Sequence, residues 1–138
     1  MKFFDVSQLS SYNKLISLVL HFLYGEAANM LYIAICDDDP VYLCRAMGIV
    51  RGYFSGRGTN TSIFTFTSAQ KLLNADTGQF NIFLLDVMVG QENGILLAKH
   101  LRQMHPDCSI IFISSYLEFA LKGYHVNAFR YLLKSNLE

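Results

Sequence analysis

A short apolar run that ends in a single carboxylate most constrains the fold of this chain. Residues 82–85 read Ile-Phe-Leu-Leu, and Asp86 follows them directly. An uninterrupted apolar run of this length is typical of a strand buried on both faces, as in parallel sheets covered by helices. Such sheets bind ligands beyond the carboxyl ends of their strands. Asp86 is therefore a candidate site residue, although an aspartate at this position can equally begin a turn.

Strand-like and helix-like segments alternate along the rest of the chain. Apolar or β-branched runs predict strands over 31–36, 61–66, 82–85, 109–114 and 128–133. Apolar residues at helical spacing predict helices over 43–54, 68–74, 97–104 and 117–123, with Ser68 capping the second. This alternation predicts right-handed βαβ units and a single parallel sheet.

The composition limits the classes of function that the chain serves. Its 138 residues suit one domain, and 52% of them are hydrophobic, enough for a sizeable core. The formal net charge is zero, so bulk charge does not indicate a nucleic-acid or anionic-membrane surface. The three cysteines form no C-x-x-C pair, which argues against disulfides and a zinc site. Reduced thiols in a cytosolic protein are the expected state.

Residues 1–29 stand apart from this alternation. Apolar residues at helical spacing predict a helix over about residues 7–24. Its apolar stretch is shorter than the roughly 20 residues that span a bilayer. We expect this helix to cover apolar surface of the domain that begins at residue 30. A leader upstream of Met30 and a segment docked on a neighbouring chain are the alternatives.

Polar side chains lie at the ends of four predicted strands. Asp37 and Asp38 follow the first strand, Asp86 the third and Lys134 the fifth, and Ser114 closes the fourth. Because the carboxyl ends of parallel strands share one edge of a sheet, we expect these residues to converge. Clustered carboxylates suit Mg²⁺, while a lysine and a hydroxyl meet phosphoryl oxygens. Together they are the parts of an aspartyl-phosphate site.

Each of these residues also has a simpler explanation. One aspartate of the run Asp37 to Asp39 is expected to cap the helix that Pro40 begins. Taken alone, Lys134 is a surface lysine and Ser114 is a hydroxyl at a strand end. The convergence of all of them on one edge favours the functional interpretation.

The pattern resembles the receiver domain of bacterial two-component response regulators over about residues 31–134. The motifs are Ile-Cys-Asp-Asp-Asp-Pro at 35–40, Leu-Leu-Asp at 84–86 with Gly94 eight residues on, Ile-Ser-Ser at 113–115 and Tyr-Leu-Leu-Lys at 131–134. The resemblance implies an α/β, flavodoxin-like, doubly wound sheet of five parallel strands in the order 2-1-3-4-5. The usual last helix is expected to be absent, since only residues 135–138 follow Lys134.

The resemblance also implies a role for each site residue. Asp86 is the phosphoacceptor, and Ser114 and Lys134 contact the phosphoryl group. The implied ligands of Mg²⁺ are Asp37, Asp38, Asp86 and the main-chain carbonyl of Met88. Ser114 and Tyr131 are the implied switch residues, and the helix over 117–123 is the expected signalling face.

The resemblance implies a cytoplasmic signalling domain that assists its own phosphoryl transfer and dephosphorylation. Its expected partner is a sensor histidine kinase, and homodimerisation stays open. Residues 116–131 resemble regulators with a LytTR-type output domain, so DNA is expected to be bound only through a domain outside this chain. The alternative is a non-phosphorylated pseudo-receiver that acts as a docking module. An Asp-nucleophile phosphatase is disfavoured, because Met88 stands where such enzymes place a second aspartate.

Two positions depart from the family pattern. Gly90 stands where the family usually has proline, so the loop after Asp86 is expected to be more mobile. Ser135 replaces a proline that usually follows the lysine in a cis bond. A cis bond before a non-proline residue costs about 2.5–4 kcal/mol. We therefore expect a trans bond there, with Lys134 displaced from the site.

Overall fold

The structure, a computed structural model, describes residues 30–55 and 60–136. The helix expected over about residues 7–24 lies outside the described residues. The division into an extension over 1–29 and a domain over 30–138 therefore stays a prediction. No helix within the described ranges has the length and hydrophobicity needed to cross a bilayer.

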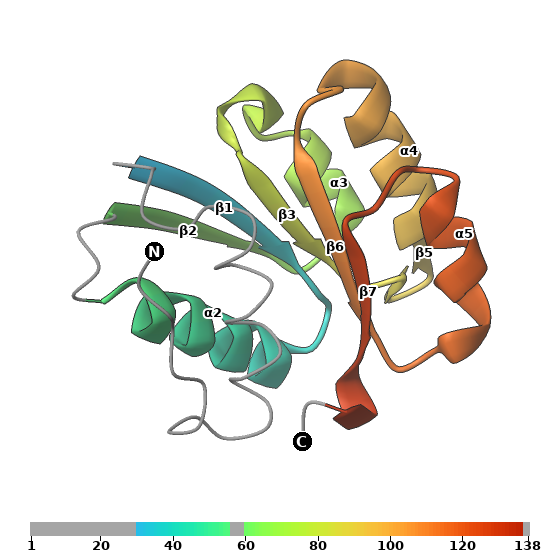
Figure 1. Cartoon of the computed structure of the whole chain (residues 1–138), viewed down its shortest axis with the longest axis horizontal. Helices are drawn as coiled ribbons and strands as arrows, with labels where there is room; N and C mark the ends of the chain where they lie inside the picture. The colour runs from blue at the N-terminus through green and yellow to red at the C-terminus, as the bar shows by residue number, and fades with distance from the viewer. Residues whose placement is uncertain (1–29, 56–59, 137–138) are drawn as a thin grey trace, which may run out of the picture.

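Five parallel strands form the central sheet in the order β2-β1-β3-β6-β7 (Figure 1). Their bounds are β1 Met30–Cys36, β2 Asn60–Phe66, β3 Ile82–Leu85, β6 Ser109–Ser114 and β7 Arg130–Leu133. Counted among these five strands alone, the order is 2-1-3-4-5, which confirms the predicted flavodoxin-like sheet. The last strand begins later than predicted, because the N–H of Ala128 donates to the carbonyl of Gly123 in the preceding turn.

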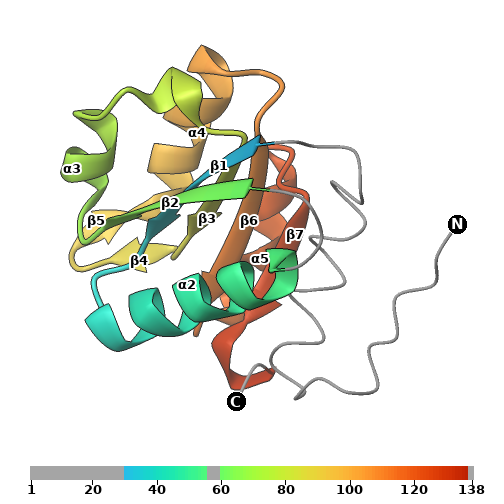
Figure 2. The same ribbon diagram turned by 90° about the vertical axis from the view of Figure 1, so that its left-hand side faces the viewer.

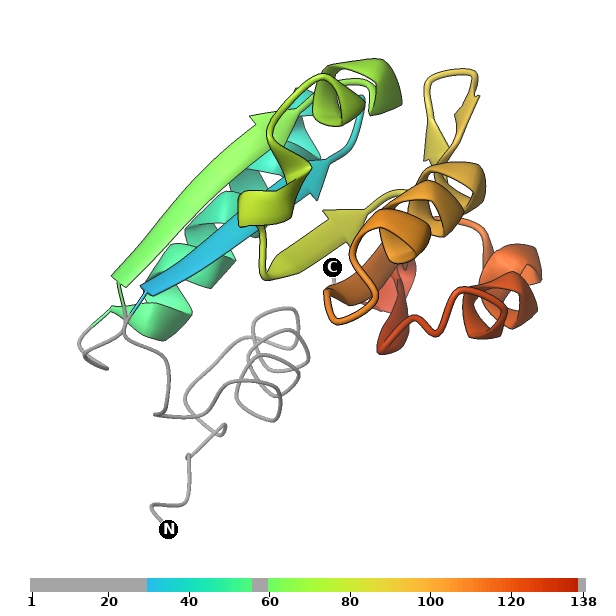
Figure 3. The ribbon, with the colours of Figure 1, turned by 90° about the horizontal axis from the view of Figure 1, so that it is seen from above.

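Helices cover both faces of the sheet. α2 (Pro40–Phe54) lies on one face, while α3 (Ala69–Leu73), α4 (Gly94–Met104) and α5 (Ala120–Tyr124) lie on the other (Figures 2 and 3). The described residues also form three 3₁₀ turns: η2 Thr77–Gln79, η3 Leu117–Phe119 and η4 Lys134–Asn136. The helix predicted over 117–123 is thus divided into a 3₁₀ turn and one short helix.

Alternate residues of each strand point to opposite faces of the sheet, so two apolar cores form. Ile33 and Ile35 of β1 belong to the core under α2, and Ala34 and Cys36 belong to the core under α3 and α4. All four residues of β3 are buried, which confirms the prediction of a central strand covered on both faces. The polar residue that follows β3 is therefore placed by a rigid element.

A small hairpin, absent from the sequence prediction, follows β3. β4 (Met88–Val89) pairs antiparallel with β5 (Glu92–Asn93), and Gly90 begins the two-residue loop between them with φ +63°. A proline cannot adopt this φ, because its ring fixes φ near −65°. Glycine at position 90 therefore fits a tight hairpin turn. The mobility expected of this loop stays a prediction.

Candidate functional site

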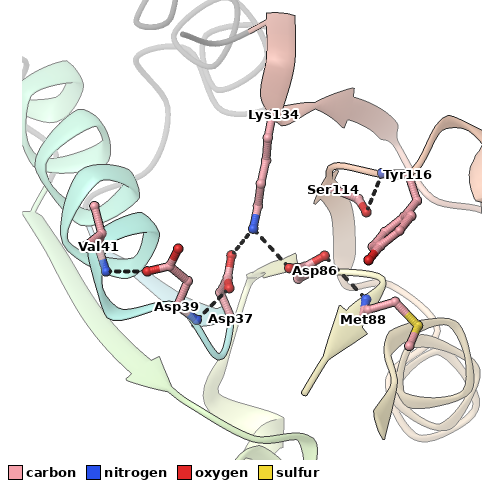
Figure 4. A network of polar contacts seen from close by, with 8 residues as sticks. All are labelled: Asp37, Asp39, Val41, Asp86, Met88, Ser114, Tyr116 and Lys134. Carbon is pink, nitrogen blue, oxygen red and sulfur yellow. Dashed lines mark hydrogen bonds and ion pairs between the residues drawn. The ribbon is translucent and has the colours of Figure 1, made fainter. Parts of the chain in front are cut away.

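The polar residues that the sequence placed at strand ends come together at one edge of the sheet (Figure 4). Asp37 follows β1, Asp86 follows β3, Ser114 ends β6 and Lys134 follows β7, and these strands are neighbours in the sheet. All four side chains are buried, and Thr77 is the only other buried polar or charged residue in the described part of the chain. Burial of charge is costly unless it is paired, so these residues are held together by a specific arrangement.

The three consecutive aspartates divide their roles. Asp39 caps α2, since its side chain accepts the N–H of Val41 at 2.9 Å and Pro40 takes the first helical position. Asp37 in turn accepts the N–H of Asp39 at 2.9 Å, which fixes the turn between β1 and α2. One of the three is therefore a cap, as predicted. Asp37 and the exposed Asp38 are left to face the site.

Asp86 is held by the backbone on one side and by a cation on the other. Its Oδ1 accepts the N–H of Met88 at 3.3 Å, and its Oδ2 accepts a hydrogen bond from Lys134 Nζ at 3.0 Å. The loop behind it is tight, because a Cβ at Gly94 would lie 2.0 Å from the carbonyl oxygen of Asp86. Glycine at this position lets α4 begin directly against the loop that carries the carboxylate.

Lys134 joins the two buried carboxylates. Its Nζ lies 2.7 Å from Asp37 Oδ2 and 3.0 Å from Asp86 Oδ2. Burial alone would lower the pKa of Lys134, but the ion pairs with Asp37 and Asp86 outweigh it and raise this pKa. The peptide bond to Ser135 is trans, as expected. The expected displacement of Lys134 is wrong, since its Nζ lies within 3.0 Å of both carboxylates.

The carboxylates form a group that fits a divalent cation. Asp37, Asp38 and Asp86 each offer an oxygen, and these oxygens lie within 4.8 Å of one another. With Lys134 beside them, three negative charges and one positive charge leave a formal charge of minus two. Burial raises the pKa of Asp37, while hydrogen bonds from Lys134 and the Asp39 N–H lower it by less. Hard oxygen donors with excess negative charge suit Mg²⁺.

Ser114 and Tyr131 meet at the backbone of Tyr116. Ser114 Oγ accepts the N–H of Tyr116 at 3.2 Å, and the hydroxyl of Tyr131 donates to the carbonyl of the same residue. Burial raises the pKa of Tyr131, and a hydrogen bond with Ser114 lowers it by less. The fully buried Ser114 is therefore linked through one peptide segment to η3 and α5.

Two contributors to the site were not identified from the sequence. Glu92 accepts the N–H groups of Ala69 and Gln70 and so ties the hairpin after Asp86 to the start of α3. The ring of Tyr42, on the first turn of α2, lies against Lys134. No local sequence signal indicates the contact between Tyr42 and Lys134. Nothing local in the sequence marks Glu92.

Comparison with known proteins identifies relatives of this chain. A family model described as "Response regulator receiver domain" matches residues 33–138. The sensory transduction protein LytR of Streptococcus mutans is 34% identical over 68 residues, 49% of this chain and 27% of that protein. The sensory transduction protein LytT of Bacillus subtilis is 39% identical over 54 residues, 39% of this chain and 22% of that protein. The matches thus span about a quarter of these relatives, whose names agree with the predicted LytTR-class resemblance.

Solved structures share the fold. The BeF3-activated receiver domain of DrrB, a Thermotoga maritima protein, is 28% identical with a TM-score of 0.61, covering 76% of this chain and 85% of that one. The response regulatory domain of mrkE from Klebsiella pneumoniae has a TM-score of 0.66 at 21% identity, covering 75% of this chain and 83% of that one. The second likeness concerns the fold alone.

Proposed function

Since the chain belongs to the response regulator receiver domain family, we propose that it is the phosphoacceptor of a two-component signalling system. Asp86 accepts a phosphoryl group from the phosphohistidine of a sensor histidine kinase, and the resulting change of conformation controls an output domain outside this chain. The observation that carries the proposal is Lys134, which pairs with Asp86 and Asp37 at the edge where Asp38 also lies.

The proposed metal is Mg²⁺, and the residues present fit it. Asp37, Asp38 and Asp86 would hold it, with the main-chain carbonyl of Met88 as the proposed fourth ligand from the protein. When bound, Mg²⁺ supplies neutralisation of the charge on the phosphoryl oxygens. The formal charge of minus two on these side chains supports a divalent cation that prefers oxygen ligands.

Phosphoryl transfer is catalysed mainly by positioning the reacting groups and stabilising their charge. A carboxylate oxygen of Asp86 forms the new bond to phosphorus while the bond from phosphorus to the kinase histidine breaks, and the histidine nitrogen keeps the electron pair. Lys134 Nζ lies 3.0 Å from Asp86 Oδ2, and this distance supports its proposed pairing with a phosphoryl oxygen after transfer. The hydroxyl of Ser114 is the proposed second donor. Preorganised donors of this kind stabilise the charge that spreads over the transferring group.

Signal output is proposed to begin at Ser114. When its hydroxyl turns towards the phosphoryl group, its bond to the N–H of Tyr116 is lost or strained. The carbonyl of Tyr116 accepts a hydrogen bond from the hydroxyl of Tyr131, so Tyr131 is expected to change its contacts as well. The next segments of the chain, η3 and α5, carry the exposed apolar side chains of Leu117, Leu121 and Tyr124. These side chains are the proposed signalling surface. A phosphoryl group shifts this equilibrium only by its differential affinity for the two states.

Intact-mass measurement after incubation with acetyl phosphate and Mg²⁺ tests the acceptor. The parent should gain one phosphoryl group, and Asp86→Asn should gain none. Asp39→Asn is the matched control, because it removes a carboxylate of the same edge while asparagine caps a helix equally well. Undiminished labelling of Asp86→Asn would contradict the assignment. A parent that is never labelled would favour the docking-module alternative.

Metal and switch are tested separately. Asp38→Ala should weaken Mg²⁺ binding, whereas Asp39→Asn should not; equal affinity in Asp38→Ala would place the metal elsewhere. On phosphorylation, changes of NMR chemical shift should concentrate in residues 114–131 rather than in α2. The same proposal includes the kinase partner, a cytoplasmic location and an output domain of the LytTR type; homodimerisation stays open.

A further inference from the structure

The ammonium of Lys134 has a third neighbour besides its two carboxylates. Its Nζ lies 4.1 Å from the centroid of the Tyr42 ring. A cation within about 6 Å of an aromatic face is attracted by the ring, and the attraction grows when both are withdrawn from water. Lys134 is buried and Tyr42 is half-buried, so the contact lies in the favourable range.

The ring of Tyr42 is placed by the same turn that forms the site. Asp37 holds the N–H of Asp39, and Asp39 caps α2, so the first turn of this helix is fixed relative to the carboxylates. Tyr42 lines the same small cavity as Asp37 and Asp86. Its ring also lies 5.3 Å from the guanidinium carbon of Arg45, so it faces two cations.

The Lys134 side chain is flexible, and an additional contact would restrict it. A lysine ammonium is a point charge at the end of a flexible side chain, which loses rotamer entropy when it is held in one place. Asp37 and Asp86 attract it from two strands, and Lys134 Nζ is closer to the oxygen of Asp37 than to that of Asp86. An aromatic face beside the ammonium reduces the number of positions that Nζ can occupy.

We propose that Tyr42 is a positioning residue whose ring holds the Lys134 ammonium close to Asp86. In this position the ammonium contacts the carboxylate of Asp86 or the phosphoryl group that Asp86 carries. The proposal rests on the function proposed above. The hydroxyl of Tyr42 is not required, because the ring face makes the contact. Phenylalanine should therefore replace Tyr42, and an aliphatic side chain should not.

The contact is tested first in metal-free protein by NMR. The ε-methylene protons of Lys134 should be shifted upfield by the ring and show nuclear Overhauser effects to it. Both signals should persist in Tyr42→Phe and disappear in Tyr42→Leu. Parent-like Lys134 shifts in Tyr42→Leu would overturn the contact independently of any metal or phosphorylation.

The function of the contact is tested with beryllofluoride, an analogue of the phosphoryl group, in the presence of Mg²⁺. Tyr42→Leu should bind beryllofluoride about fivefold to thirtyfold more weakly, the range expected for a partly desolvated cation–π contact. Tyr42→Phe should bind like the parent, as should Cys44→Ala, an exposed change on the same helix. Mg²⁺ affinity measured without beryllofluoride should not fall in any variant.

The outcomes separate the proposals. Equal weakening of Mg²⁺ and beryllofluoride binding in Tyr42→Leu would show that the ring only supports α2, and would overturn the positioning role. Parent-like beryllofluoride affinity in Tyr42→Leu would overturn it too. Tyr42→Met is a second variant without a ring, so the result does not depend on one substitution folding well. A parent that binds no beryllofluoride and accepts no phosphoryl group would instead overturn the proposed function, and this role with it.

Discussion

Lys134 and Asp37 form the shortest ion pair of the described residues, with 2.7 Å between Nζ and Oδ2. The two residues come from opposite ends of the domain and meet only because β7 and β1 end at the same edge of the sheet. This ammonium lies where it compensates a carboxylate that is also a proposed metal ligand. In the proposed metal site, Lys134 and a divalent cation would therefore both contact Asp37.

The first prediction concerns Lys134→Met. Removing a positive charge beside Asp37 and Asp86 should strengthen Mg²⁺ binding, because less repulsion opposes the metal. Without metal, the same variant should unfold more easily by about 3–5 kcal/mol, the usual cost of leaving buried charges unpaired. Calorimetric titration and urea unfolding with and without Mg²⁺ measure both effects. Lys99→Met, an exposed change on α4, is the control; weaker Mg²⁺ binding in Lys134→Met would contradict the prediction.

The second prediction concerns Gly94→Ala. A Cβ there would lie 2.0 Å from the carbonyl oxygen of Asp86 and 2.9 Å from that of Val87, and neither backbone atom can move freely. The variant should lose about 1–3 kcal/mol or more of stability, as overpacking does. Gly52→Ala is the matched control, since nothing lies within 4 Å of its Cβ and α2 should gain about 0.5–1 kcal/mol. Thermal unfolding of the parent and both variants measures these differences in stability. A Gly94→Ala protein as stable as its parent would contradict the predicted clash.

Much of the fold follows from local sequence signals. The continuous apolar run of β3 predicts a central strand, and the cap at Asp39 with Pro40 predicts the start of α2. The convergence of Asp37 and Asp86 follows from a parallel sheet, because strand ends then share an edge. These predictions need only periodicity and topology.

Other features depend on contacts that no local pattern encodes. The β4–β5 hairpin has two residues in each strand, too few for any periodicity to be visible. The prediction that Lys134 is displaced was wrong. It was based on the residue that follows, Ser135, whereas ion pairs with Asp37 and Asp86, far away in the sequence, hold the side chain. The contact of Tyr42 with Lys134 is equally a product of the tertiary fold.

The third prediction is a dependence of stability on alkaline pH. Burial, together with nearby carboxylates led by Glu92, raises the pKa of the Cys36 thiol from 9.0 to about 12. Between these values the unfolded chain loses the proton while the folded protein keeps it, so stability falls as pH rises. The contribution of Cys36 is fully present below pH 9 and is lost by about pH 12.

Urea unfolding of the metal-free protein across this pH range measures the effect. Cys36→Ala should flatten the slope by up to about 1.4 kcal/mol per pH unit. Ile110→Val is the control, since it changes a fully buried residue that has no titrating group. Its loss of stability should be the same at every pH. An unchanged slope in Cys36→Ala would mean that the thiol does not titrate differently in the two states.

The last prediction concerns the carboxylate of Glu92, which caps α3 from the hairpin that follows the site. It accepts the N–H of Ala69 at 2.9 Å and that of Gln70 at 3.3 Å, while Ser68 accepts the N–H of Lys71 at 3.1 Å. The first three N–H groups of α3 are thus satisfied by two side chains far apart in the sequence. A negative charge at this end also favours the helix dipole.

Glu92→Ala should therefore cost about 1–2 kcal/mol of stability, in the range of lost helix caps and charged hydrogen bonds. Glu92→Gln should cost less, because its amide oxygen still accepts one hydrogen bond. Amide exchange should also quicken at Val89 and Gln91 in Glu92→Ala, since this carboxylate ties the hairpin to α3. Gln91→Ala, an exposed neighbour, is the control for both measurements. If exchange quickens only in α3 and not in the hairpin, Glu92 caps the helix without restraining the loop beside Asp86.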